Sequence, residues 1–77
     1  AQLRAEIKSA EDELESLALK IMDLENMLND PEVVRDHKRL QEVCDELEDT
    51  KFHQDEVLER WEELAQRQED MEAEEQA

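Results

Sequence analysis

The chain has 77 residues, of which 44% are charged, and its formal net charge is −16. A chain of this length can form one small domain but cannot bury a layered core. Binding to nucleic-acid phosphates depends on Lys and Arg, so this acidity excludes a general nucleic-acid binder and leaves room only for local contact. No apolar run approaches the roughly 20 residues that a membrane-spanning helix needs, so we expect no membrane association.

The first predicted element is a helix over about residues 2–28. Apolar residues recur along it in steps of three and four, a spacing that places them on one stripe of an α-helix. A disordered acidic segment would not keep such a stripe apolar over its whole length. The stripe consists of Leu3, Ile7, Ala10, Leu14, Leu17, Ile21, Leu24 and Leu28.

The second predicted element is a turn over residues 29–37, around the one proline of the chain, Pro31. Proline disfavours helical geometry at the residue before it and therefore ends the first helix. Asp30 is a candidate N-cap, and Pro31 takes the first helical position, where its missing N–H costs nothing. Residues 32–34 form a short turn, and Asp36 is a second candidate cap.

The third predicted element is a helix over about residues 38–71, followed by an acidic tail, residues 72–77, that we expect to fray because it lacks periodic anchors. Thr50, Gln54 and Gln68 are polar positions on its apolar stripe, and we interpret them as tolerated imperfections of a half-exposed stripe. The stripe consists of Leu40, Val43, Leu47, Thr50, Gln54, Val57, Trp61, Leu64, Gln68 and Met71.

Together the two stripes, which we call the seam, predict an all-α fold: an antiparallel two-helix coiled-coil hairpin over residues 1–71. Pairing Leu28 with Leu40 beside the turn places Ile7 opposite Trp61. A lone hairpin buries only its seam, so we expect modest stability. We expect a monomer; the alternative is a structural coiled coil that self-associates through its seam.

No pattern in the sequence indicates catalysis, a metal site or a bound cofactor. The many carboxylates lie on solvated helix faces without a cleft that could shift their pKa values apart. His37, Cys44 and His53 do not have the spacing of metal ligands, and without any glycine there is no phosphate-binding loop. We therefore expect no enzyme activity within these residues.

Cys44 follows the seam residue Val43, and we expect it to be partly buried at the edge of the seam. A single cysteine and the absence of a secretory signal indicate a reducing cytoplasm. The chain begins with Ala1 rather than Met, so we expect it to be a piece of a longer protein. Trp61 is interpreted as a seam residue at the open end; alternatively, it packs onto the rest of that protein.

The one basic cluster lies at the turn and therefore at the tip of the predicted hairpin. Cations at the start of a helix oppose the helix dipole, which suggests another role, such as contact with phosphate groups. The alternative is that they make weak ion pairs with neighbouring carboxylates. Two valines beside them could supply an apolar pad. The predicted tip surface consists of Val33, Val34, Arg35, Lys38 and Arg39.

Two sequence elements carry a resemblance to a known family. They are Asp-Pro-Glu-Val-Val at residues 30–34, with Asp36 soon after, and Glu-Arg-Trp-Glu-Glu-Leu at residues 59–64. With the heptad helices around them, they resemble the C-terminal coiled-coil domain of ABC-F ATPases, the soluble, non-transporting branch of the ABC superfamily. The resemblance extends to about Gln66.

This resemblance implies a cytoplasmic, ribosome-associated protein that acts in translation. Two upstream cassettes would bind ATP and magnesium, and they would be partners of the hairpin. The hairpin itself would be an accessory element without a cofactor, contacting the ribosome or nucleic acid through its tip.

A second resemblance covers the turn alone. Leu-Asn-Asp-Pro-Glu-Val-Val at residues 28–34, Asp36 and Lys-Arg-Leu at residues 38–40 are similar to the N-terminal helical domain of bacterial peptide chain release factors. The Arg-Trp-Glu segment at residues 60–62 has no clear place in that family. Both resemblances imply a partner at the ribosome.

Overall fold

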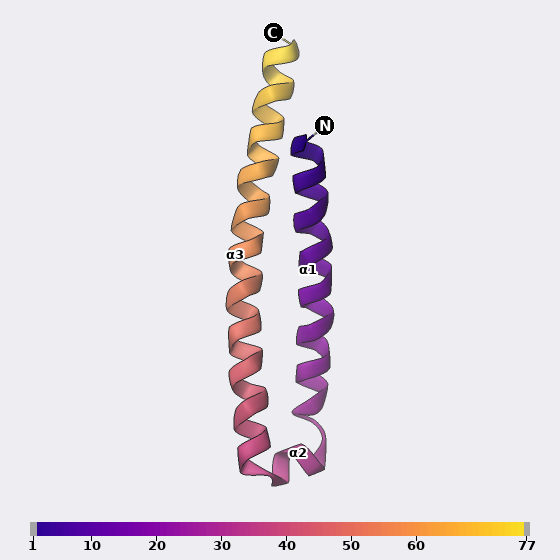
Figure 1. Ribbon diagram of the computed structural model, residues 1–77, viewed down its shortest axis with the longest axis vertical. Coiled ribbons are helices and arrows are strands. Elements are labelled where there is room, and N and C mark those ends of the chain that lie inside the picture. Colours follow the sequence, from indigo (N-terminus) through magenta and orange to yellow (C-terminus); the bar gives the residue numbers. More distant parts are fainter. Residues whose placement is uncertain (1, 77) are drawn as a thin grey trace.

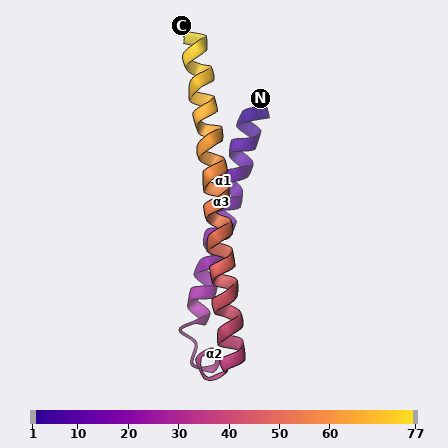
Figure 2. The same cartoon turned by 90° about the vertical axis from the view of Figure 1, so that its left-hand side faces the viewer.

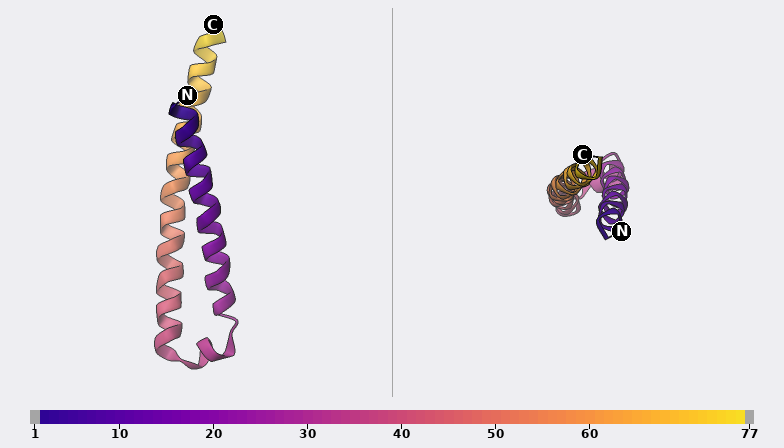
Figure 3. Two further views of the ribbon diagram at one scale, coloured as in Figure 1. Left: turned by 45° about the vertical axis from the view of Figure 1, so that its right-hand side comes forward. Right: turned by 90° about the horizontal axis from the view of Figure 1, so that it is seen from above.

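The computed structural model describes residues 2–76, and this range contains three helices and no strand. They are α1 (Gln2–Met27), α2 (Pro31–Arg35) and α3 (His37–Gln76), shown in Figure 1. The two long helices lie side by side and run in opposite directions, with α2 at the end where they are connected (Figures 1 and 3). The molecule is a rod of 62 × 16 × 14 Å, and we call the end with α2 the tip.

Asp30 and Pro31 set the boundary between α1 and α2. Asp30 has extended geometry, with φ −82° and ψ 120°, as expected of a residue that precedes proline. Its side chain accepts a hydrogen bond of 3.0 Å from the backbone N–H of Glu32. Its carbonyl accepts from the N–H groups of Val33 and Val34. Asp30 is therefore the N-cap of α2, and Pro31 occupies the first turn, where no N–H is needed.

Asp36 ends α2 and begins α3. Its backbone N–H donates to the carbonyl of Val33, and its side chain accepts from the N–H groups of Lys38 and Arg39, both at 3.2 Å. The predicted turn over residues 29–37 thus contains a short helix, because two aspartate caps lie close enough to enclose one. The next helix begins at His37, one residue before the predicted start.

The long helix α3 continues beyond the residues expected to fold. The tail predicted to fray at residues 72–77 is helical as far as Gln76, and Ala77 lies outside the described residues. Glu, Ala and Gln have high intrinsic helix propensity, so the helix continues here although residues 72–74 are exposed. In Figure 1, α3 consequently projects past the start of α1.

The core lies between α1 and α3 and falls into two clusters along the rod. The tip-side core is closed by Val33 of α2, and the far core lies toward the opposite end. The tip-side core consists of the buried Leu24, Val33 and Val43 and the partly buried Leu28, Leu40 and Leu47. The far core consists of the buried Ile7, Ala10, Val57 and Leu64 and the partly buried Leu3, Leu14, Leu17 and Trp61.

The predicted seam and the observed burial agree along most of the rod. Ile21 and Thr50 are also buried, and Gln54 and Gln68 are partly buried. Thr50 satisfies its hydroxyl within its own helix, because Oγ1 donates to the carbonyl of Glu46 at 2.7 Å. The exception is Met71, which is 53% exposed.

No helix within residues 2–76 has both the length and the apolar character that crossing a bilayer requires.

Candidate interaction surface at the tip

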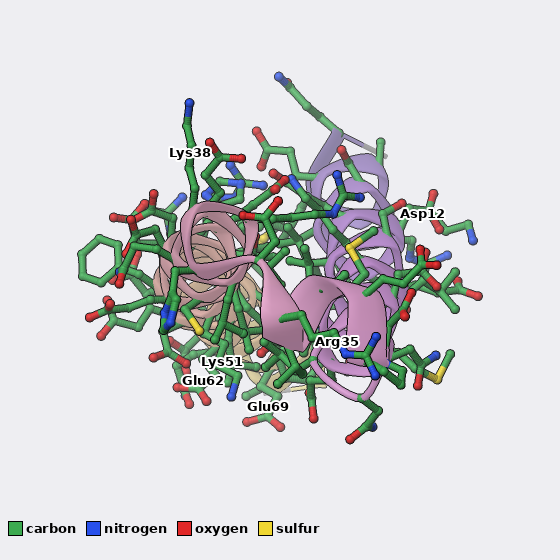
Figure 4. The ribbon with its side chains drawn as sticks, turned by 90° about the horizontal axis from the view of Figure 1, so that it is seen from below. Asp12, Arg35, Lys38, Lys51, Glu62 and Glu69 are labelled. Atoms are coloured by element: carbon green, nitrogen blue, oxygen red, sulfur yellow. The ribbon has the colours of Figure 1, made fainter. Side chains whose placement is uncertain are left out.

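The tip surface is built by two short capped segments, the start of α2 and the start of α3. Figure 4 shows this end of the molecule along the axis of the rod, with α2 lying beside the first turn of α3. The side chains of Asp30 and Asp36 accept hydrogen bonds from backbone N–H groups, and these bonds fix the backbone conformation of the tip. The basic side chains of Arg35, Lys38 and Arg39 are exposed to solvent.

The two valines predicted as an apolar pad have different environments. Val33 is 3% exposed and packs in the tip-side core with Leu24 and Val43, so it is not part of an exposed pad. The reason is geometric: successive residues of a helix are about 100° apart, so only one of two adjacent valines can face the core. Val34, which is 48% exposed, remains available at the surface.

Met27 is an exposed apolar residue near the tip that was not predicted to belong to this surface. It is the last residue of α1 and is 38% exposed. Its position off the apolar stripe is the signal that would have identified it as exposed. Together with Val34 it gives this end of the rod some apolar surface.

The predicted basic residues Arg35, Lys38 and Arg39 are all exposed. Among the described side chains, none of the three has a carboxylate within ion-pair distance; the ion pairs present lie along α1 and α3. The alternative of weak local ion pairs is therefore not realised in the structure. Since other exposed cations also lack an ion-pair partner among the described side chains, what distinguishes the tip is that three cations lie within five residues of the chain.

The structure does not gather these cations into a compact patch. In Figure 4, Arg35 extends from α2 and Lys38 extends from α3 in clearly different directions. The cause is Asp36, which separates the two helices and changes the direction of the chain between them. Such an arrangement suits several separate contacts on an extended partner better than the binding of one anion.

A polar cluster on the long helices was not expected from the sequence. Glu13 of α1 accepts a hydrogen bond from Arg60 at 2.9 Å and lies 3.0 Å from Nε2 of His53, both on α3. Beside this cluster, the indole N–H of Trp61 donates to Glu11 at 3.4 Å. Contacts of this kind at the protein surface contribute about 0.2–1 kcal/mol each, so their main effect is to fix the register of the two helices.

Cys44 is exposed, although we expected it to be partly buried. It follows the buried Val43, and the turn of roughly 100° between successive residues of a helix carries it away from the seam. Within the described part of the chain, no group of three or more His, Cys, Asp and Glu residues is placed to hold a metal ion.

Comparison with known proteins gives one match. A family model described as the ABC transporter C-terminal domain matches residues 1–66, whereas no curated protein and no solved structure matches significantly. The matched range includes the tip and both core clusters and ends where the predicted resemblance to ABC proteins ends. It supports that resemblance over the one to release factors. The chain belongs to the ABC transporter C-terminal domain family.

Proposed function

We propose that this chain is the C-terminal antiparallel coiled-coil hairpin of an ABC-F-type ATPase and acts as a non-catalytic interaction module in translation. The family match supports an ABC-type parent protein. The turn at residues 30–34 and the Arg-Trp-Glu element at residues 60–62 support the ABC-F branch. In the parent, the cassettes would bind ATP and magnesium, and the protein would work in the cytoplasm.

The shape of the molecule supports contact through the tip. Both described ends of the chain are directed away from α2, and α3 extends past the start of α1 (Figures 1 and 3). A partner as large as a ribosome could therefore contact the tip while the rest of a longer protein lies at the other end of the rod, which is 62 Å long. The hairpin buries most of its own seam, and its charge of −16 opposes association of two copies. We therefore infer that it acts as a monomer.

The single observation that carries the proposal is the distribution of positive charge. Arg35, Lys38 and Arg39 lie exposed and unpaired at the tip, whereas acidic residues predominate along the rest of the rod. An acidic rod is repelled by RNA, so a basic end would be the part that approaches it. We propose that these three residues contact ribosomal RNA or an acidic ribosomal protein surface and that Val34 adds an apolar contact.

The test is co-sedimentation of the 77-residue chain with purified ribosomes. Replacing Arg35, Lys38 and Arg39 with glutamate is expected to lower the bound fraction about tenfold or more, since each lost phosphate contact removes a favourable counterion release. The matched control carries Lys8→Glu, Lys20→Glu and Lys51→Glu, which change the net charge equally but lie along the rod. The control is expected to keep most of the binding.

Salt dependence provides a second readout of the same experiment. Binding by the unmodified chain is expected to weaken steeply between about 50 and 200 mM salt, and binding by the tip variant to depend less on salt. Equal losses in the tip variant and the control would show that net charge, not the tip, determines binding. Full binding by the tip variant would contradict the proposal outright.

A further inference from the structure

The first turn of α3 carries a histidine among the basic residues of the tip. His37 is the first residue of α3 and is exposed, and Lys38 and Arg39 follow it directly. In Figure 2, α1 ends short of the tip, so α2 and the start of α3 form the outermost part of this end of the rod. His37 therefore lies on the surface for which contact with the ribosome is proposed above.

The basic side chains of this turn extend around the helix rather than to one side of it. Successive residues of a helix are about 100° apart, so His37, Lys38 and Arg39 cover three different directions. No acidic residue lies in the first turn of α3. The carboxylate of Asp36, which precedes it, accepts from the backbone N–H groups of Lys38 and Arg39 at 3.2 Å and thus caps the helix. A protonated His37 would therefore add positive charge in a direction that Lys38 and Arg39 leave open.

The two histidines of the chain have different surroundings. Nε2 of His53, on the rod, lies 3.0 Å from the carboxylate of Glu13, and its Nδ1 lies 3.9 Å from that of Glu56. By contrast, the ion pairs present among the described side chains do not include His37. His53 thus has anionic partners within the hairpin, whereas the imidazole of His37 is open to a group of another molecule.

Charged groups from all three helices belong to the surroundings of His37. Asp30 and Asp36 accept hydrogen bonds from backbone N–H groups at the starts of α2 and α3. Among the described side chains, no carboxylate lies within ion-pair distance of His37, so the anion that would stabilise its charged form has to come from a partner. The nearest other carboxylates along α1, α2 and α3 are the exposed Glu25, Glu32 and Glu42, and the cations of the tip are Arg35, Lys38 and Arg39.

We propose, on the basis of the function proposed above, that His37 is a further binding residue of the tip and contacts a phosphate group of ribosomal RNA in its protonated form. Phosphates spread along an RNA backbone suit cations that extend in several directions. Histidine has an ordinary pKa of about 6.5, and a neighbouring anion favours its protonated form. Binding then transfers a proton from the solvent to the unprotonated ring nitrogen. Because binding takes up a proton, it becomes tighter as the pH falls.

The first experiment measures binding of the 77-residue chain to purified ribosomes by co-sedimentation at about pH 7.5 and at about pH 6. The dissociation constant is expected to be about threefold lower or more at the lower pH, since uptake of one proton can change it by up to about tenfold per pH unit. Equal affinities at the two pH values would overturn the role of His37 and leave the proposed function intact. Absence of binding at both would overturn the proposed function and, with it, the role of His37.

The second experiment identifies the group that takes up the proton. His37→Gln is expected to lose the gain in affinity at low pH, and His37→Lys is expected to bind at high pH about as tightly as the unmodified chain does at low pH. His53→Gln is the matched control and should keep the gain, because His53 lies on the rod beside Glu13. Circular dichroism at both pH values verifies that each variant is folded. A gain of the same size in His37→Gln and His53→Gln would overturn the proposal.

The third experiment tests phosphate as the anion. Protein-free ribosomal RNA replaces the ribosome, and the unmodified chain should again bind more tightly at the lower pH. One added phosphate contact should also steepen the dependence of log affinity on log salt by about 0.7–0.9 at the lower pH, and His37→Gln should not show this change. A pH effect that requires ribosomal protein, or one without a change in salt dependence, would contradict contact between His37 and phosphate.

Discussion

Replacing Leu24 with alanine is expected to lower the free energy of unfolding by about 3 kcal/mol. Leu24 is 4% exposed and packs against Val33 and Val43, so its side chain joins all three helices in the tip-side core. The truncation leaves a cavity that the short α2 cannot fill without losing its own packing. Urea unfolding followed by helical circular dichroism measures the change.

The matched control is Leu19→Ala on the same helix. Leu19 is 53% exposed and lies on the face of α1 that points away from the seam, so its truncation should change stability by no more than about 0.5 kcal/mol. Leucine-to-alanine substitutions only five residues apart are thus expected to lower the free energy of unfolding by very different amounts. Similar losses for both variants would show that Leu24 does not occupy the core as described.

Replacing Ala10 with leucine is expected to lower the free energy of unfolding by about 1–3 kcal/mol, although it adds apolar surface. Ala10 is 0% exposed and belongs to the far core with Val57 and Leu64. A small buried residue at this position allows α1 and α3 to approach each other closely. A leucine would have to separate the helices or adopt a strained rotamer. Thermal and urea unfolding both report the loss.

Ala5→Leu is the control for this substitution because Ala5 is exposed on the same helix. Alanine and leucine have similar helix propensity, so this variant should remain within about 0.5 kcal/mol of the unmodified chain. A neutral or stabilising effect of Ala10→Leu would mean that the far core has unfilled space. The description of Ala10 as a position where the two helices pack closely would then be wrong.

The helices could be predicted because their signals are local or periodic. A stripe of three- and four-residue spacing identifies the buried face whichever partner covers it, so the sequence alone predicts that Ile7, Leu24, Val43 and Val57 belong to the core. Pro31 and its flanking aspartates likewise act through the backbone next to them. Their hydrogen bonds depend on few other residues.

Burial near the ends of the elements could not be predicted in this way. Helix α2 is too short for periodicity, and the choice between Val33 and Val34 depends on how α2 lies against Leu24. Met71 has the right position on its stripe, but burial also requires a facing helix. The tail was expected to fray because it has no anchors, whereas its helix propensity carries α3 to Gln76.

The sequence predicts which basic residues lie at the tip, but it does not predict the directions in which their side chains extend. The sequence places Arg35 and Lys38 together, but the cap at Asp36 directs them away from each other. The contact of Glu13 with His53 and Arg60 was missed because it joins residues far apart in the chain. The predicted register places Asp55 opposite Glu13, two residues from His53 and five from Arg60, so it brings these residues near one another without specifying the contact.

We propose that the tip is the part of the hairpin that touches the ribosome, and photo-crosslinking tests this most directly. A photoreactive amino acid would replace Val34 at the tip or Phe52 on the rod, both of which are exposed. Incubation with purified ribosomes and irradiation is predicted to give crosslinks to ribosomal RNA or protein from position 34 and few or none from position 52. Crosslinks from position 52 alone, or equally from both positions, would contradict the account.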